Sequence, residues 1–70
     1  MKPADILHAR DKLGLTQAQF AQVLGYGHVM RVSQLERGER HPSPAAVRLI
    51  AAYLDGYRPA GWPKKKMKHG

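Results

Sequence analysis

Glycine divides the first half of this sequence into short segments, and this spacing constrains the fold more than any other feature. Gly14, Gly25 and Gly38 each follow a run in which apolar residues recur at helical spacing. Glycine readily adopts the left-handed conformation that closes a helix, so each is expected to end one. The sequence therefore predicts three short helices, which must pack against other elements to bury their apolar sides.

Capping residues mark where the first two helices begin. Pro3 suits the first position of the first helix, because its missing N–H would have no helical partner there. Thr16 and Gln19 have the spacing of a capping box, which places the start of the second helix at Gln17. Leu24 is the last apolar residue of this segment. The third helix is expected over residues 29–36.

A fourth helix is expected after the polar loop that ends at Pro42. Ser43 can cap it and Pro44 fits its first position. Its expected apolar stripe consists of Val47, Ile50, Ala51 and Leu54. Beyond Asp55 the glycines and prolines indicate an irregular arm rather than a fifth helix.

Composition limits the class of protein. Seventy residues allow one domain, and the absence of cysteine excludes a disulfide framework. No apolar stretch approaches the roughly 20 residues that cross a bilayer, and no secretion signal is recognisable, so we expect a cytoplasmic protein, nucleoid-associated when bound to DNA. The net charge of +7 favours a polyanionic partner such as nucleic acid, although the same charge could serve solubility alone.

Catalysis is not expected. His8, His28, His41 and His69 lack metal-ligand spacing, and no nucleophile and base are recognisable. Gly25 and Gly27 lack the rest of a nucleotide-binding fingerprint. We therefore predict that the protein is not an enzyme and uses no metal and no cofactor.

Several short motifs carry a family resemblance. They are Leu15-Thr16-Gln17, Phe20-Ala21, Leu24-Gly25, Val32-Ser33-Gln34-Leu35-Glu36-Arg37-Gly38 and Pro42-Ser43. Over residues 10–54 the chain resembles the phage repressor and Cro-like helix-turn-helix regulators, also called the xenobiotic-response-element type. The resemblance implies an all-α bundle of four to five helices, with a DNA-binding domain at 1–55. Beyond it the residues themselves indicate an irregular aromatic arm at 56–63, a possible dimer contact, and a basic tail at 64–70. The tail contains Lys64, Lys65, Lys66 and Lys68 and is expected to be disordered.

The resemblance implies that the third helix enters the major groove of DNA, whose width of about 12 Å admits a helix. The positions matching the family's base-contacting sites are Val29, Met30, Arg31 and Gln34. Glutamine can pair with adenine and arginine with guanine, while an apolar side chain can pack on a thymine methyl. Alternatively, Val29 and Met30 pack against the turn, and Arg31 and Gln34 form a solvated polar face.

A second group is expected to contact the DNA backbone and so fix register without specifying sequence. Its members are Gln17, His28, Ser33, Arg37, Arg40, His41 and Ser43. The alternative for Gln17 is an ordinary first-turn glutamine. The acidic Glu39 weakens the attraction of this loop for phosphate.

The resemblance further implies a structural ion pair between Arg10 and Glu36, which could otherwise be unrelated surface charges. The sequence also departs from the family: the segment between Gly25 and Gly38 is one residue longer than usual. Either Gly27 or His28 could therefore cap the third helix, and the reading positions could shift by one.

Relatives commonly dimerise through the region after the fourth helix. The candidates here are Tyr53, Leu54, Tyr57 and Trp62, which could instead fold back onto their own core. We expect a homodimeric autorepressor that binds an inverted-repeat operator, without a small-molecule effector and without a membrane partner. An antitoxin-like interaction module with secondary DNA binding is the alternative, and RNA binding is a third possibility.

Overall fold

The structure is a computed structural model that describes residues 1–63. Four helices follow one another in this range: α1 (Pro3–Leu13), α2 (Gln17–Leu24), α3 (Val29–Arg37) and α4 (Pro44–Leu54). No strand occurs among these residues. The all-α class is therefore confirmed, with four helices followed by an irregular arm. The predictions about the basic tail at 64–70 lie outside the described residues.

The capping signals place the ends of α2 as expected. Thr16 Oγ1 accepts the backbone N–H of Gln19 at 3.1 Å, and Gln19 Oε1 accepts that of Thr16 at 3.0 Å. At the other end Gly25 has a φ of 79°, the left-handed conformation that most side chains disfavour. Gly38 ends α3 in the same way. Local chemistry thus fixes how short these helices are.

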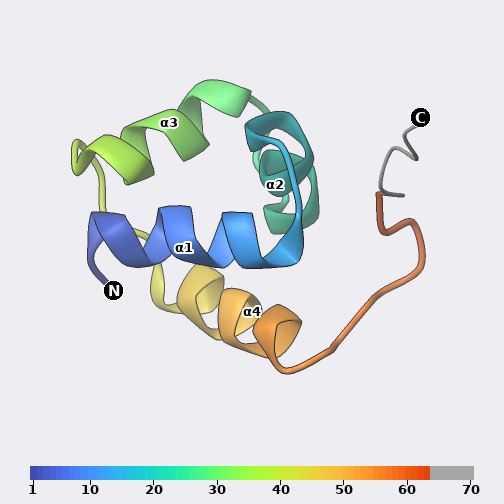
Figure 1. The fold of residues 1–70 in the computed structure, drawn as a ribbon. Helices are drawn as coiled ribbons and strands as arrows, with labels where there is room; N and C mark the ends of the chain where they lie inside the picture. The colour runs from blue at the N-terminus through green and yellow to red at the C-terminus, as the bar shows by residue number, and fades with distance from the viewer. Residues whose placement is uncertain (64–70) are drawn as a thin grey trace.

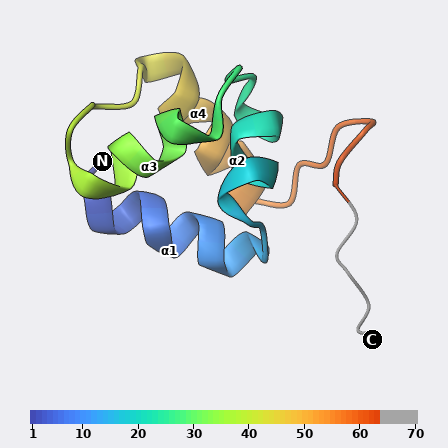
Figure 2. The same cartoon turned by 90° about the horizontal axis from the view of Figure 1, so that it is seen from above.

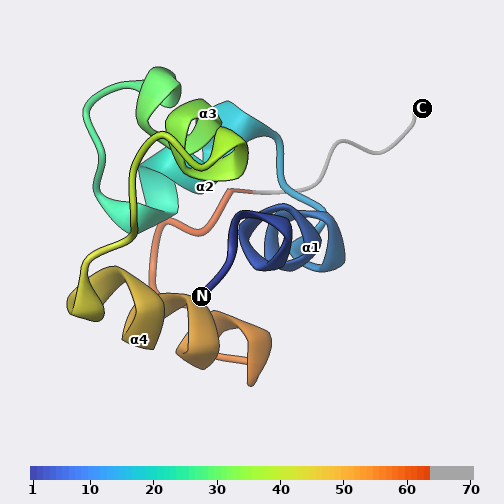
Figure 3. The same cartoon turned by 90° about the vertical axis from the view of Figure 1, so that its left-hand side faces the viewer.

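All four helices contribute to one hydrophobic core. In Figure 1, α1 crosses the middle of the molecule, with α3 above it and α4 below it. Viewed from the side in Figure 3, the same three helices surround an interior that α2 closes from behind. The largest fully buried side chains are Ile6, Phe20, Val32, Leu35 and Ile50. The core therefore holds α3 from one side only.

The inward side of α4 differs from the expected stripe. Ala46, Ile50 and Tyr53 are buried, whereas Ala51 and Leu54 are exposed. Both sets fit a helical period, so spacing alone could not choose between them. The structure favours the side that carries Tyr53, because its ring buries a large apolar area and its hydroxyl has a partner in the interior.

The arm after α4 turns back along the molecule and runs past α2 (Figure 2). Its Trp62 packs against the core beside Tyr53. The longest helices, α1 and α4, have 11 residues each. Within residues 1–63 no helix is long and apolar enough to cross a membrane.

Candidate nucleic-acid interface

Helix α3 presents one side to the core and the other to solvent. Val32 and Leu35 are 0% and 2% exposed, so they anchor the helix. Met30 is 62% exposed and Val29 is 47% exposed, although both are apolar. His28 is the N-cap residue, with extended backbone angles. Despite the longer turn, α3 begins at Val29 as expected. Of the two alternatives, Gly27 and His28, the residue that caps the helix is His28.

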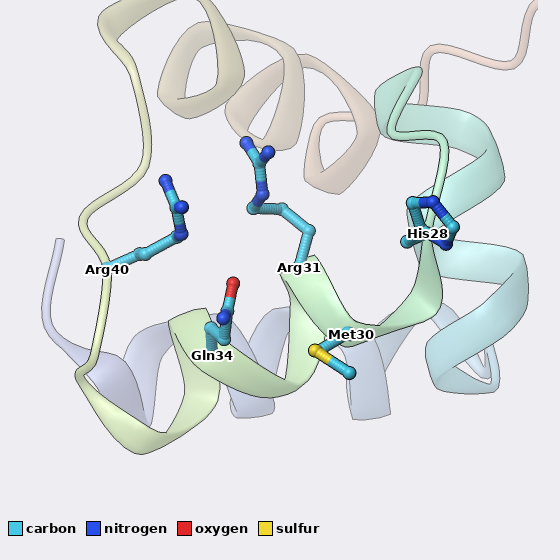
Figure 4. Close-up of a pocket in the computed structure, with 5 residues that line it drawn as sticks. All are labelled: His28, Met30, Arg31, Gln34 and Arg40. Atoms are coloured by element: carbon cyan, nitrogen blue, oxygen red, sulfur yellow. The ribbon is translucent and has the colours of Figure 1, made fainter.

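A shallow hollow lies over the outer side of α3. Figure 4 shows side chains of α3 and of the loop that follows it around this space, together with the residue that precedes the helix. The lining residues are His28, Met30, Arg31, Gln34 and Arg40. All five belong to the residues assigned to DNA contacts from the sequence. The fold thus brings three expected base-reading residues and two expected backbone-binding residues to one surface.

Tyr26 supports one of these reading residues. The Arg31 Cζ atom lies 5.4 Å from the centroid of the Tyr26 ring, which is cation–π geometry. Tyr26 is half-buried and packs against the core. Tyr26 lies in the turn between α2 and α3, and its five-residue separation from Arg31 in the sequence carries no recognisable signal of this contact.

Two expected backbone-binding residues are linked to each other at the end of α3. Arg37 Nη1 donates to Ser33 Oγ at 2.6 Å, while Nε and Nη2 donate to the two carboxylate oxygens of Glu39 at 2.8 and 3.1 Å. The hydrogen bond from Arg37 lowers the pKa of the Glu39 carboxyl, and the same bond raises the pKa of the Arg37 guanidinium. Because both side chains are more than half exposed, this pair remains accessible to ligands.

A second ion pair ties three helices together. Arg10 Nε lies 2.6 Å from Glu36 Oε2, and Arg10 Nη1 donates to the backbone carbonyl of Leu15 at 3.1 Å. Gln17 Nε2 donates to Glu36 Oε1 at 2.9 Å. The Gln17 side chain, expected on DNA phosphate, thus has a partner inside the protein. The backbone of Gln17 still forms the first turn of α2.

The remaining backbone candidates lie in the loop before α4 and at its start. Ser43 is the N-cap residue, and its Oγ accepts the N–H of Ala46 at 3.1 Å. His41 is exposed in the loop. Neither residue lines the hollow over α3.

The four dimer candidates divide into two pairs. Tyr53 is 3% exposed, and its hydroxyl donates to the carbonyl of Val23 at 2.5 Å. Burial raises the pKa of this hydroxyl. Trp62 packs edge-on against Tyr53, with ring centroids 4.8 Å apart. Tyr53 and Trp62 therefore pack onto their own core, which is the alternative to a dimer contact. Leu54 and Tyr57 are 42% and 53% exposed.

Arg58 holds the arm in this position, a role that sequence reasoning missed. Its Nη1 donates to the carbonyls of Tyr53 and Tyr57 at 2.7 and 2.8 Å, and its Cζ lies 4.5 Å from the centroid of the Trp62 ring. A basic residue close after a helix was the available signal, since cations favour the negative helix C-terminus.

Two short helices joined by a turn, with the second exposed and lined by polar and basic groups, define a DNA-binding helix-turn-helix protein. The helix-turn-helix family model matches residues 6–62, which include all four helices except the first residues of α1. The chain belongs to this phage repressor and Cro-like family of DNA-binding transcriptional regulators, which are not enzymes. Comparisons with curated proteins and with solved structures gave no match.

Proposed function

We propose that the protein is a homodimeric autorepressor that reads double-stranded DNA through the major groove with the outer side of α3. The hollow formed by α3 and the following loop carries this proposal. Arg31 and Gln34 supply hydrogen-bond donors for base edges, and Arg40 and His28 lie at the rim, where phosphates would pass. The exposed Met30 and Val29 can pack on thymine methyl groups.

The test is a binding titration on the DNA upstream of the chain's own gene, repeated at several salt concentrations. Arg31→Ala and Gln34→Ala should each cost about 1 to 3 kcal/mol on the preferred site and relax its base preference. Arg48→Ala is the matched control, because Arg48 is an exposed arginine of α4 outside the hollow. Equal losses for Arg31 and Arg48 would contradict a reading role for α3.

The dimer part of the proposal depends on the apolar residues still exposed at the end of α4. Leu54 and Tyr57 lie three residues apart in sequence and are both exposed, so a two-fold dimer could bring the same two side chains of each copy together. A two-fold dimer would place two reading helices about 34 Å apart, one turn of DNA. The fraction of operator bound would then depend on the concentration of the protein, without a small-molecule effector. The protein would act in the cytoplasm, on the nucleoid.

Leu54→Asp should shift the protein to monomers in sedimentation velocity and weaken binding to inverted repeats more than to single half-sites. Leu7→Asp is the control, because Leu7 is a leucine of α1 that is 44% exposed. A dimer that survives Leu54→Asp and Tyr57→Asp would place the interface elsewhere.

Two other candidate functions are separated from this proposal by further observations. An unfolded aromatic arm would favour the antitoxin-like alternative, and the packing of Trp62 on Tyr53 gives no such support. RNA binding would be indicated if duplex RNA bound as tightly as DNA, since phosphate contacts alone do not separate the two.

A further inference from the structure

We propose that Tyr26 is a positioning residue for Arg31 and thereby sets the preference of the protein for guanine. The inference rests on the proposed function, because Arg31 must first read a base. It concerns a residue that does not line the hollow itself. Tyr26 would act on DNA only through the guanidinium that lies over its ring.

The Tyr26 ring is a fixed platform. The backbone N–H of Tyr26 donates to the carbonyl of Ala21 at 2.9 Å, which ties the residue to the end of α2. The preceding Gly25 has a φ of 79° and directs the chain into this turn. The side chain is half-buried and packs against the core. Because both backbone and ring are anchored, the guanidinium above them gains a defined location.

The way Arg31 is held leaves its donors free. In a cation–π contact the cation is attracted to the face of the aromatic ring and needs no hydrogen-bond acceptor. The N–H donors of the guanidinium lie in the guanidinium plane, so the contact does not use them. Within residues 1–63 the Arg31 side chain forms no salt bridge and no hydrogen bond. A guanidinium fixed in place with free donors is suited to the paired acceptors O6 and N7 of guanine.

Arg37, on the same helix, shows the opposite arrangement. All three of its donor nitrogens are engaged, by Glu39 and Ser33. The Nε and Nη2 edge of Arg37, which could pair with a base, is already held by Glu39, whereas Arg31 keeps its ring partner while both of its edges stay open within the described part of the chain. Arg31 is therefore better suited than Arg37 to a specific base contact. Its neighbour is an aromatic ring, which does not compete with guanine for the guanidinium donors as a carboxylate would.

The experiment starts with selection from a library of random DNA duplexes by the wild-type protein. The positions that lose their guanine in a parallel selection with Arg31→Ala identify the base that Arg31 reads. Binding of the selected duplex and of a version altered at that guanine is then measured for Tyr26→Leu and Tyr26→Phe. Leucine fills the apolar space without a ring face, and phenylalanine keeps the face without the hydroxyl.

We expect Tyr26→Leu to weaken binding of the selected duplex about fivefold and to reduce discrimination against the altered duplex. Tyr26→Phe should bind as the wild type does. In an Arg31→Ala background, Tyr26→Leu should add no further loss, because the group it positions is gone. Affinity for non-specific duplex should not change in any Tyr26 variant.

Three results would overturn the inference, and each has a separate meaning. Independent losses from Tyr26→Leu and Arg31→Ala would show that Tyr26 supports the fold only. An unchanged guanine preference in Arg31→Ala would remove Arg31 as the reader, while DNA binding would stand. Failure of the wild type to select any sequence would remove the proposed function itself. Thermal unfolding of each variant separates these results from simple loss of the fold.

Discussion

Two arginine–glutamate pairs in this protein have the same chemistry but opposite surroundings. Arg10 and Glu36 are 20% and 10% exposed, and their pair connects α1 to α3. Arg37 and Glu39 are 54% and 53% exposed, and their pair connects the end of α3 to the next loop. Glu36 and Arg37 are neighbours in sequence, yet one faces the interior side of α3 and the other faces solvent.

The difference shows how one short helix can serve both stability and binding. The Glu36 carboxylate accepts hydrogen bonds from Arg10 and Gln17, so its charge is matched where water is scarce. Removing one partner leaves the other charge poorly solvated. The exposed pair has water as a substitute, contributes little to stability and can exchange one partner for phosphate. Burial therefore decides which pair holds the fold.

Breaking the partly buried pair of Arg10 and Glu36 should have the largest effect. Glu36→Gln keeps the shape of the side chain but leaves the Arg10 guanidinium without a carboxylate. We expect the free energy of unfolding to fall by about 2 kcal/mol, the size of a lost hydrogen bond to a charged group, measured by urea denaturation with circular dichroism.

Glu39→Gln is the matched control, because it removes the same charge from the exposed pair. Its denaturation midpoint should stay at the wild-type value. If both variants lost the same stability, burial would not be what separates the two pairs.

Gln17 tests the comparison in another way, because its side chain donates a hydrogen bond to Glu36 of the partly buried pair. The sequence had predicted that the same side chain contacts a DNA phosphate. Gln17→Ala removes the hydrogen bond to Glu36 and should cost about 1 kcal/mol of stability. Gln22→Ala, at an exposed glutamine of the same helix, is the control and should cost nothing. A loss of DNA affinity with unchanged stability would instead assign the Gln17 side chain to phosphate alone.

Breaking the exposed pair of Arg37 and Glu39 should change the affinity for DNA rather than the stability of the fold. Glu39→Gln removes the negative charge and one of the two oxygen acceptors that hold Arg37, so binding to any duplex should tighten severalfold. One added phosphate contact should steepen the dependence of log affinity on log salt by about 1. Base preference should not change.

Asp55→Asn is the control for net charge, since it removes one acid at the end of α4, outside the hollow. Equal tightening by Glu39→Gln and Asp55→Asn would mean that overall charge, and not release of Arg37, governs the affinity.

The helices were predictable because their limits depend on neighbours in the chain. Thr16 with Gln19, Ser43 and the closing glycines act within one helical turn, so each end could be placed from a few residues. The outward residues of α3 followed from the family resemblance. The hollow itself, with Arg40 brought beside α3, depends on the path of a loop and was not implied by spacing.

The contacts that could not be predicted from the sequence are those of side chains with several possible partners. Gln17 could face phosphate or Glu36, and Tyr53 could face a second copy or Val23. Both choices depend on distances between helices, which local signals do not encode. Tyr26 and Arg31 are a further case, because a ring in a turn gives no sign of which cation lies over it.

The smallest predicted effect concerns the protonation of the exposed pair. The hydrogen bond from Arg37 lowers the pKa of Glu39 below the usual value for glutamate. A lowered pKa in the folded state means that the pair supports the fold above the unfolded-state pKa and loses this support as the pH falls through the folded-state pKa. The contribution to stability is small because water screens both groups.

NMR titration of the Glu39 carboxyl should therefore give a pKa below the usual value in the free wild type and a higher pKa in Arg37→Gln. Binding of a DNA duplex should raise the pKa of Glu39 as well, because phosphate takes Arg37 away and adds negative charge nearby. A Glu39 pKa that stayed low in the complex would show that Arg37 keeps its partner, and the exposed pair would then be as fixed as the buried one.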